Sequence, residues 1–176
     1  MITVAENYTL RSWKESDLES LVRYANNYNI AKNLTDKFPH PYTKEHGIAF
    51  IAMASGNFPL RIFAIEIDGE AAGGIGLHPQ EDIYRRNMEL GYWLAEKHWG
   101  KGIMPNAIRE ITDYGFRNFD IDRIFARPFG SNKASQRVLE KAGFHFETKF
   151  EKTLIKNGVL EDELFYAARR NQYPQS

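Results

Sequence analysis

The segment Trp99-Gly100-Lys101-Gly102-Ile103-Met104-Pro105 lies between a strand-like stretch and a helix-like stretch, and it is the most informative part of the chain for predicting the fold. Before it, Met88-Glu89-Leu90-Gly91-Tyr92-Trp93-Leu94 alternates and is rich in aromatic residues, which predicts a strand. After it, apolar residues recur at spacings of three and four, which predicts an amphipathic helix over about 103–118. Two glycines where a helix begins can expose three or four backbone N–H groups, and this arrangement binds a pyrophosphate.

Two better-known phosphate motifs share the order of strand, glycine loop and helix, and their spelling excludes both. A P-loop requires G-x-x-x-x-G-K-[ST], and no Gly-Lys pair in this chain is followed by Ser or Thr. A dinucleotide fingerprint requires G-x-G-x-x-G. After Gly100-x-Gly102 the place of the third glycine is occupied by Pro105, and after Gly74-x-Gly76 it is occupied by Pro79.

The composition predicts one domain over residues 1–176 and excludes several function classes. Lys plus Arg and Asp plus Glu both number 23, so no global field attracts nucleic acid or an anionic membrane. The chain has no cysteine, which excludes disulfides, thiolate metal sites and an acyl-cysteine intermediate. The N-terminus lacks the pattern of a signal peptide, and no apolar run approaches the roughly 20 residues of a membrane span. We therefore expect a cytoplasmic protein without nucleic-acid or membrane partners.

The first half of the chain predicts a strand over 8–13 and two helices. A capping box formed by Ser16 and Glu19 would open the first helix, and the second would run from Thr43 to about Ala54, carrying Ile48, Ile51 and Ala52. The loop Phe38-Pro39-His40-Pro41-Tyr42 is a candidate wall of a substrate mouth.

Turn signals organise the rest of the chain. Asp68-Gly69 and Asn157-Gly158 predict hairpins that join strands 61–67 with 70–77 and 147–156 with 159–168. A strand over 123–129 and a helix over about 133–142, ended by Gly143, lie between them. The pattern predicts a single α/β domain with a mixed sheet.

The glycine loop resembles that of the GNAT superfamily of acyl-CoA-dependent N-acetyltransferases, usually spelled [Arg/Gln]-x-x-Gly-x-[Gly/Ala]. Trp99 stands in the Arg/Gln place, Gly102 in the glycine place and Met104 in the small-residue place. The segment from Asn132 to Phe144 resembles the cofactor-side helix of that family.

Two further segments resemble the branch of ribosomal-protein (alanine/serine) N-alpha-acetyltransferases: Leu10-Arg11-Ser12-Trp13 and Gly91-Tyr92-Trp93-Leu94. The resemblance implies an acyl-CoA N-acyltransferase fold of bacterial type, with a central mixed, mostly antiparallel sheet and helices on both faces. It also implies acetyl-CoA as cosubstrate. Its cofactor-binding residues would be Trp93, Leu94, Trp99, Gly100, Lys101, Gly102, Ile103, Met104, Pro105, Asn132 and Ser135.

Glu89 is the candidate general base that would deprotonate the amine. A carboxylate in the middle of a covered strand is costly unless it is paired or used. The alternative is a structural role: a salt bridge to an arginine such as Arg85 or Arg86, or a place at a solvent-exposed strand end.

Ser135 is the candidate partner of the leaving thiolate. Many members of the family carry a tyrosine seven residues beyond the asparagine, where this chain has Leu139, and a serine fills the Ser135 place in the ribosomal-protein branch. The alternative is that Ser135 only caps the first turn of its helix. No histidine has metal-ligand spacing, so no metal is expected, and His78 is a reserve base.

The expected function is acetyl transfer from acetyl-CoA to a primary amine by direct attack in a ternary complex. The resemblance favours a protein N-terminal α-amine as acceptor. The alternatives are a small-molecule amine such as an antibiotic, polyamine or amino acid, or a non-catalytic acyl-CoA-binding domain. A homodimer is a further expectation from the family.

Overall fold

The computed structural model of the chain describes residues 2–5, 7–56 and 58–173. Its contacts divide the chain into two compact units, which are described separately below. The first unit comprises Met1–Gly76 and Tyr92–Ile103, and the second comprises Leu77–Gly91 and Met104–Ser176.

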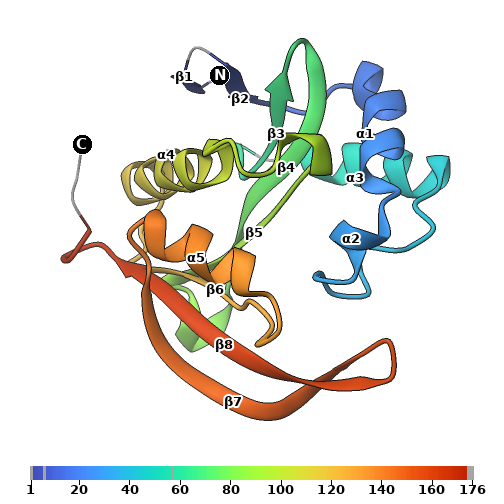
Figure 1. Cartoon of the computed structure of the whole chain (residues 1–176). Helices are drawn as coiled ribbons and strands as arrows, with labels where there is room; N and C mark the ends of the chain where they lie inside the picture. The colour runs from blue at the N-terminus through green and yellow to red at the C-terminus, as the bar shows by residue number, and fades with distance from the viewer. Residues whose placement is uncertain (1, 6, 57, 174–176) are drawn as a thin grey trace. The chain divides into compact units, whose positions relative to one another are not determined.

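The described part of the first unit comprises β1 to β3, most of β4, the last three residues of β5 (Asn87–Leu94), the helices α1 to α3 and two short 3-10 turns. Figure 1 labels these helices and strands. The strands are β1 (Ile2–Ala5), β2 (Tyr8–Arg11), β3 (Ile62–Ile67) and most of β4 (Glu70–Pro79). The helices are α1 (Leu18–Ala25), α2 (Tyr28–Ala31) and α3 (Lys44–Ser55), and the 3-10 turns are Glu15–Asp17 and Glu96–His98. β1 pairs antiparallel with β2, β2 with β3, and β3 with β4.

A core of aromatic and aliphatic side chains joins the helices of the first unit to its strands. Trp13, Leu21, Ile51, Ile62 and Trp93 are among its buried members. α1 and α3 approach closely at Gly47, because a Cβ there would lie 2.7 Å from Leu18 Cδ1.

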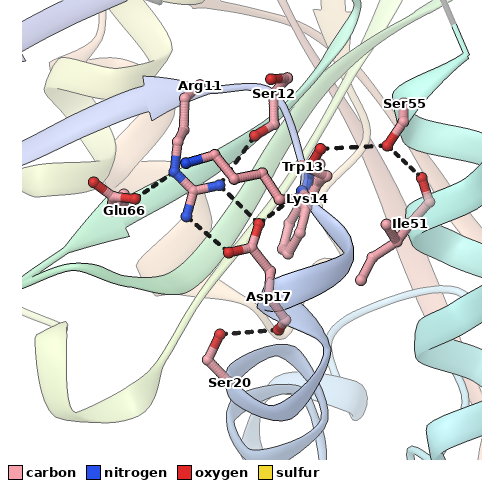
Figure 2. A network of polar contacts seen from close by, with 9 residues as sticks. All are labelled: Arg11, Ser12, Trp13, Lys14, Asp17, Ser20, Ile51, Ser55 and Glu66. Atoms are coloured by element: carbon pink, nitrogen blue, oxygen red, sulfur yellow. Dashed lines mark hydrogen bonds and ion pairs between the residues drawn. The ribbon is translucent and has the colours of Figure 1, made fainter.

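The buried ion pair of Arg11 fastens β2 to the start of α1 and to β3 (Figure 2). Arg11 donates to the two carboxylate oxygens of Asp17 at 2.7 and 2.8 Å, and its Nε donates to Glu66. The side chains of Arg11 and Asp17 are only 5% and 8% exposed. The Leu10-Arg11-Ser12-Trp13 segment therefore has a structural role, since Arg11 joins three elements and Trp13 enters the core.

The second unit contains most of β5 (Asn87–Leu94) and the three strands β6 (Arg123–Ala126), β7 (His145–Lys156) and β8 (Val159–Arg169). β5 pairs parallel with β6, and β6 and β7 each pair antiparallel with β8, so the order is β5-β6-β8-β7. Its helices are α4 (Ile103–Asn118) and α5 (Lys133–Lys141), and Asp82–Tyr84 is a 3-10 turn. β7 and β8 form the long hairpin drawn in orange and red in Figure 1.

Both helices of the second unit pack on one face of its strands. A Cβ at Gly115 of α4 would lie 2.9 Å from Ile124 Cδ1 of β6, and Tyr166 of β8 donates to Glu140 of α5 at 3.1 Å. The opposite face carries a row of phenylalanines: Phe125 stacks on Phe165, which meets Phe150 edge-on.

The two hairpin turns and the end of α5 are confirmed. Asp68, Gly69, Asn157 and Gly158 all have positive φ, as type I′ turns require. Gly143 has φ +88° and ends α5: its N–H donates to Glu140, and the N–H of Phe144 donates to Leu139, a Schellman motif.

Two local predictions are wrong. The N-cap residue of α1 is Asp17, which makes no side-chain capping bond to the helix, and no Ser16–Glu19 box forms; the Asp17 carboxylate accepts from the Lys14 N–H at 2.9 Å across the preceding 3-10 turn. The strands predicted over 8–13 and 123–129 end at Arg11 and Ala126.

No helix within the described ranges has the combination of length and apolar character that crossing a bilayer requires.

Candidate active site

The glycine loop forms a tight bend directly before α4. Gly100 and Gly102 both have φ +75°, a left-handed conformation that favours glycine, and nothing lies within 4 Å of a Cβ at either position. α4 then begins at Ile103, as the sequence predicted. Left-handed residues that alternate with ordinary ones make a concave backbone surface that binds anions.

The backbone N–H groups of residues 100–103 lie directly before or at the start of α4, where N–H groups have no acceptor within the helix. Such groups at a helix start require a partner, and the phosphate oxygens of a nucleotide supply one. The bulkier Met104 does not crowd the loop, because its side chain is packed into the protein at 8% exposure. Pro105 lies in the first turn of α4, where its missing N–H costs little. The loop therefore fits a pyrophosphate.

The end of β5 is tied to the loop by a side chain. Trp99 Nε1 donates to the carbonyl oxygen of Leu94 at 2.8 Å. The other side of the strand end is close to β4, because a Cβ at Gly73 would lie 2.7 Å from the Trp93 carbonyl oxygen. A carbonyl oxygen can accept two hydrogen bonds, so the bond from Trp99 does not by itself use the full capacity of Leu94.

Asn132 and Ser135 lie in the first turn of α5. Asn132 is the N-cap residue, and its side-chain oxygen accepts from the Ser135 N–H at 3.1 Å. The capping group is therefore Asn132, and the Ser135 hydroxyl is half-buried. This arrangement leaves the Asn132 side-chain amide to donate elsewhere.

Glu89 forms a two-pronged ion pair with Arg127. Arg127 Nε and an amino nitrogen of its guanidinium group donate to the two oxygens of Glu89, both at 2.9 Å, and its other amino nitrogen lies 3.3 Å from Glu163 of β8. The Glu89 side chain is 26% exposed. The hydrogen bond to Glu89 is the main cause that raises the pKa of Arg127.

The partner of Glu89 is thus neither of the arginines suggested from the sequence. Arg86 instead pairs with Asp120 and Asp122. Sequence reasoning missed Arg127 because it follows β6, 38 positions from Glu89, and only the parallel register of β5 and β6 brings the two together. Arg127 lies two residues beyond Phe125, the register partner of Glu89, and this spacing was the available signal.

Two histidines lie close to the candidate residues. His78 of β4 faces Gly91 of β5, since a Cβ at Gly91 would lie 3.3 Å from His78 Nε2. His98, directly before the loop, is 6% exposed, and burial and the nearby Lys101 and Lys97 lower its pKa. In the described ranges no group of three or more His, Asp or Glu side chains is placed to hold a metal ion.

The aromatic loop before α3 belongs to the core of the first unit. Phe38 packs against both Tyr42 and Trp93, with ring centroids 5.2 and 5.7 Å apart. Burial raises the pKa of Tyr42 to about 12. The loop therefore supports Trp93 from within the unit.

Comparisons with known proteins give the same family. The model of the acetyltransferase (GNAT) domain matches residues 7–145. A putative ribosomal N-acetyltransferase of Bacillus subtilis, YdaF, is 32% identical over 60% of this chain and 57% of its own. A spermidine N(1)-acetyltransferase of Escherichia coli is 23% identical over 96% of this chain and 89% of its own. The chain spans about half the length of the curated relatives that it matches at higher identity.

A solved structure confirms the expected fold class, a mixed and mostly antiparallel sheet with helices on both faces. It is RimL, a ribosomal L7/L12 alpha-N-protein acetyltransferase in complex with coenzyme A, with a TM-score of 0.82, 24% identity and coverage of 96% and 97% of the two chains. With a domain model that matches most of its length, this chain belongs to the GNAT acetyltransferase family.

Proposed function

We propose that the protein is an N-acetyltransferase that uses acetyl-CoA as donor and a primary amine as acceptor. The observation that carries the proposal is the bend formed by the left-handed Gly100 and Gly102 directly before α4, which is the segment that resembles the donor-binding loop of the family. Family membership supports the reaction class.

The residues that would hold acetyl-CoA lie along the loop, the end of β5 and the start of α5. Residues 100–105 would bind the pyrophosphate through N–H groups and the first turn of α4, with Lys101 exposed beside them. The backbone of Trp93 and Leu94 would pair with the pantetheine amides, as a strand edge pairs with an extended ligand. Asn132 would donate to the pantetheine arm through its side-chain amide.

Acetyl-CoA supplies an activated acyl group on a thiol leaving group. Glu89 would accept the amine proton through a water molecule, using the lone pairs that Arg127 does not occupy. The amine nitrogen would form the amide bond to the acetyl carbon while the bond from that carbon to sulfur breaks, and the Ser135 hydroxyl would donate a hydrogen bond to the thiolate that departs with CoA. The chain lacks cysteine, so we propose direct attack by the amine with no acyl-cysteine intermediate.

We propose a protein N-terminal α-amine as the acceptor, which the relative named as a putative ribosomal N-acetyltransferase supports. The relative named as a spermidine acetyltransferase supports the second candidate, a small amine. The third candidate, an acyl-CoA-binding domain without turnover, is motivated by Leu139 in the tyrosine place of the family.

The test is release of CoA thiol from acetyl-CoA with peptides beginning with Ala or Ser and with small amines. Turnover with the peptides alone is expected, whereas turnover only with small amines would overturn the proposed acceptor. Bound acetyl-CoA with no turnover across the panel would favour the non-catalytic domain. Glu89→Gln and Ser135→Ala are expected to retain acetyl-CoA binding and to lose most of kcat.

A further inference from the structure

We propose that Arg127 is a positioning residue that holds the Glu89 carboxylate in the orientation needed for proton transfer. This inference rests on the proposed function, in which Glu89 is the base. Arg127 itself has no contact with reacting atoms in this account; it acts through Glu89.

The strand register explains why Arg127 reaches two carboxylates at once. Glu89 of β5 lies opposite Phe125 of β6, and Arg127 follows two positions later on the same face. β8 is the neighbour of β6 on the side away from β5, and there Phe125 stacks on Phe165 of β8. Glu163 lies two positions before Phe165 and so shares its face of the sheet. Arg127 therefore lies between the carboxylates of β5 and β8 and bonds to both.

The geometry of the pair fixes the plane of the Glu89 carboxylate. A carboxylate offers about four lone-pair positions, and a two-pronged guanidinium takes one on each oxygen. The two that remain are directed away from Arg127, which is where a water or an amine proton would be accepted. Without Arg127, rotation about the last bond of Glu89 would spread these positions over a wide arc.

The contact to Glu163 holds Arg127 in turn. At 3.3 Å it is longer than either bond to Glu89, and the Glu163 side chain is 21% exposed. Loss of Glu163 should therefore loosen the arrangement less than loss of Arg127 does. A lysine in place of Arg127 keeps the charge but cannot make the two parallel bonds.

Arg123, at the start of β6 and four positions before Arg127, offers a matched control. It pairs with Glu147 of β7 at 2.5 Å and lies over the Phe125 ring at 4.5 Å, but it does not contact Glu89. Replacing Arg123 thus removes an ion pair of similar position and leaves the Glu89 carboxylate held.

The experiment compares Arg127→Gln, Arg127→Lys, Glu163→Gln and Arg123→Gln in steady-state assays with acetyl-CoA and an Ala-initiated peptide. We expect Arg127→Gln to lower kcat about 10- to 100-fold with little change in the KM for acetyl-CoA, because a small displacement of a catalytic group costs that much. Arg127→Lys should recover part of the loss, Glu163→Gln should lower kcat less than Arg127→Gln does, and Arg123→Gln should stay within about twofold of the wild type.

A double variant separates positioning from a general structural effect. If Arg127 acts only through Glu89, Glu89→Gln combined with Arg127→Gln will have the kcat of Glu89→Gln alone. The inference would be overturned if the double variant lost kcat by the product of the two single losses. Equal losses of kcat in Arg127→Gln and Arg123→Gln would also overturn it. If Arg127→Gln does not fold, Arg127→Lys carries the same comparison. A Glu89→Gln variant with normal kcat would contradict the proposed base itself, whereas an inactive Glu89→Gln beside an active Arg127→Gln would contradict only this inference.

Discussion

The indole N–H of Trp99 donates to the carbonyl oxygen of Leu94 at 2.8 Å, which closes the chain between the end of β5 and the glycine loop. Trp99 stands where the family usually has Arg or Gln. In this chain Trp99 connects the loop to the end of β5. The pantetheine arm would lie beside that strand. The bond therefore couples the two halves of the proposed donor site.

Trp99→Phe keeps most of the ring and removes this donor. A hydrogen bond of this kind contributes about 0.5–1.5 kcal/mol, so the KM for acetyl-CoA should rise about two- to tenfold while kcat changes little. Steady-state kinetics at saturating acceptor would measure this. A variant with normal KM and lowered kcat would show that the bond does not organise the donor site.

Gly102→Ala should weaken acetyl-CoA binding because Gly102 has φ +75° although the space around it is open. A left-handed alanine costs about 1 kcal/mol. Gly158 of the β7–β8 turn has φ +77° and equally open surroundings, so Gly158→Ala is the matched control. Both variants should lose similar stability in urea unfolding, and only Gly102→Ala should bind acetyl-CoA more weakly in calorimetry. Equal affinities would argue against the loop as the pyrophosphate site.

Asp17→Ala should destabilise the protein strongly because it leaves the buried Arg11 with Glu66 as its one paired carboxylate. Breaking a buried pair costs about 3 kcal/mol or more. Asp122→Ala, which breaks the exposed pair with Arg86, should cost much less. The two free energies of unfolding in urea measure the difference, and similar losses would mean that Arg11 is not an anchor of the first unit.

His98 should make the protein less stable as the pH falls. Burial lowers its pKa in the folded state, so below the unfolded value of about 6.5 the unfolded chain binds a proton that the folded chain resists. The stability that neutral His98 preserves is therefore full above that pH and declines below it. Urea unfolding between pH 8 and pH 5 should show a flatter dependence for His98→Gln than for the wild type. If the free energy of unfolding of both proteins depended on pH in the same way, His98 would not be a cause of that dependence.

The sequence predicted the elements whose signals are local. The helix that begins at Ile103, the turn at Asn157-Gly158 and the end of α5 at Gly143 depend on glycine and on apolar spacing within a few residues. Strand ends were less predictable, because β6 ends at Ala126 through its pairing with β8, which sequence spacing does not contain.

The candidate site was predictable only in part for the same reason. The loop and Asn132 are read from short motifs, whereas the ion pair of Glu89 depends on strand register and joins residues far apart in the sequence. The start of α1 shows a smaller version of the problem. Ser16 and Glu19 spell a capping box, yet α1 starts after Asp17, whose carboxylate binds Arg11 and the Lys14 N–H instead of capping the helix.

The most direct test of acetyl transfer with Glu89 as base is CoA-thiol release by the wild type and Glu89→Gln, each with acetyl-CoA and a peptide that begins with Ala or Ser. If Glu89 is the base, the wild type turns over, and Glu89→Gln has a kcat at least about 100-fold lower with equal acetyl-CoA affinity. Turnover by Glu89→Gln at the wild-type rate would contradict the assignment of the base. Absence of turnover by the wild type with every amine, despite bound acetyl-CoA, would contradict the proposed reaction.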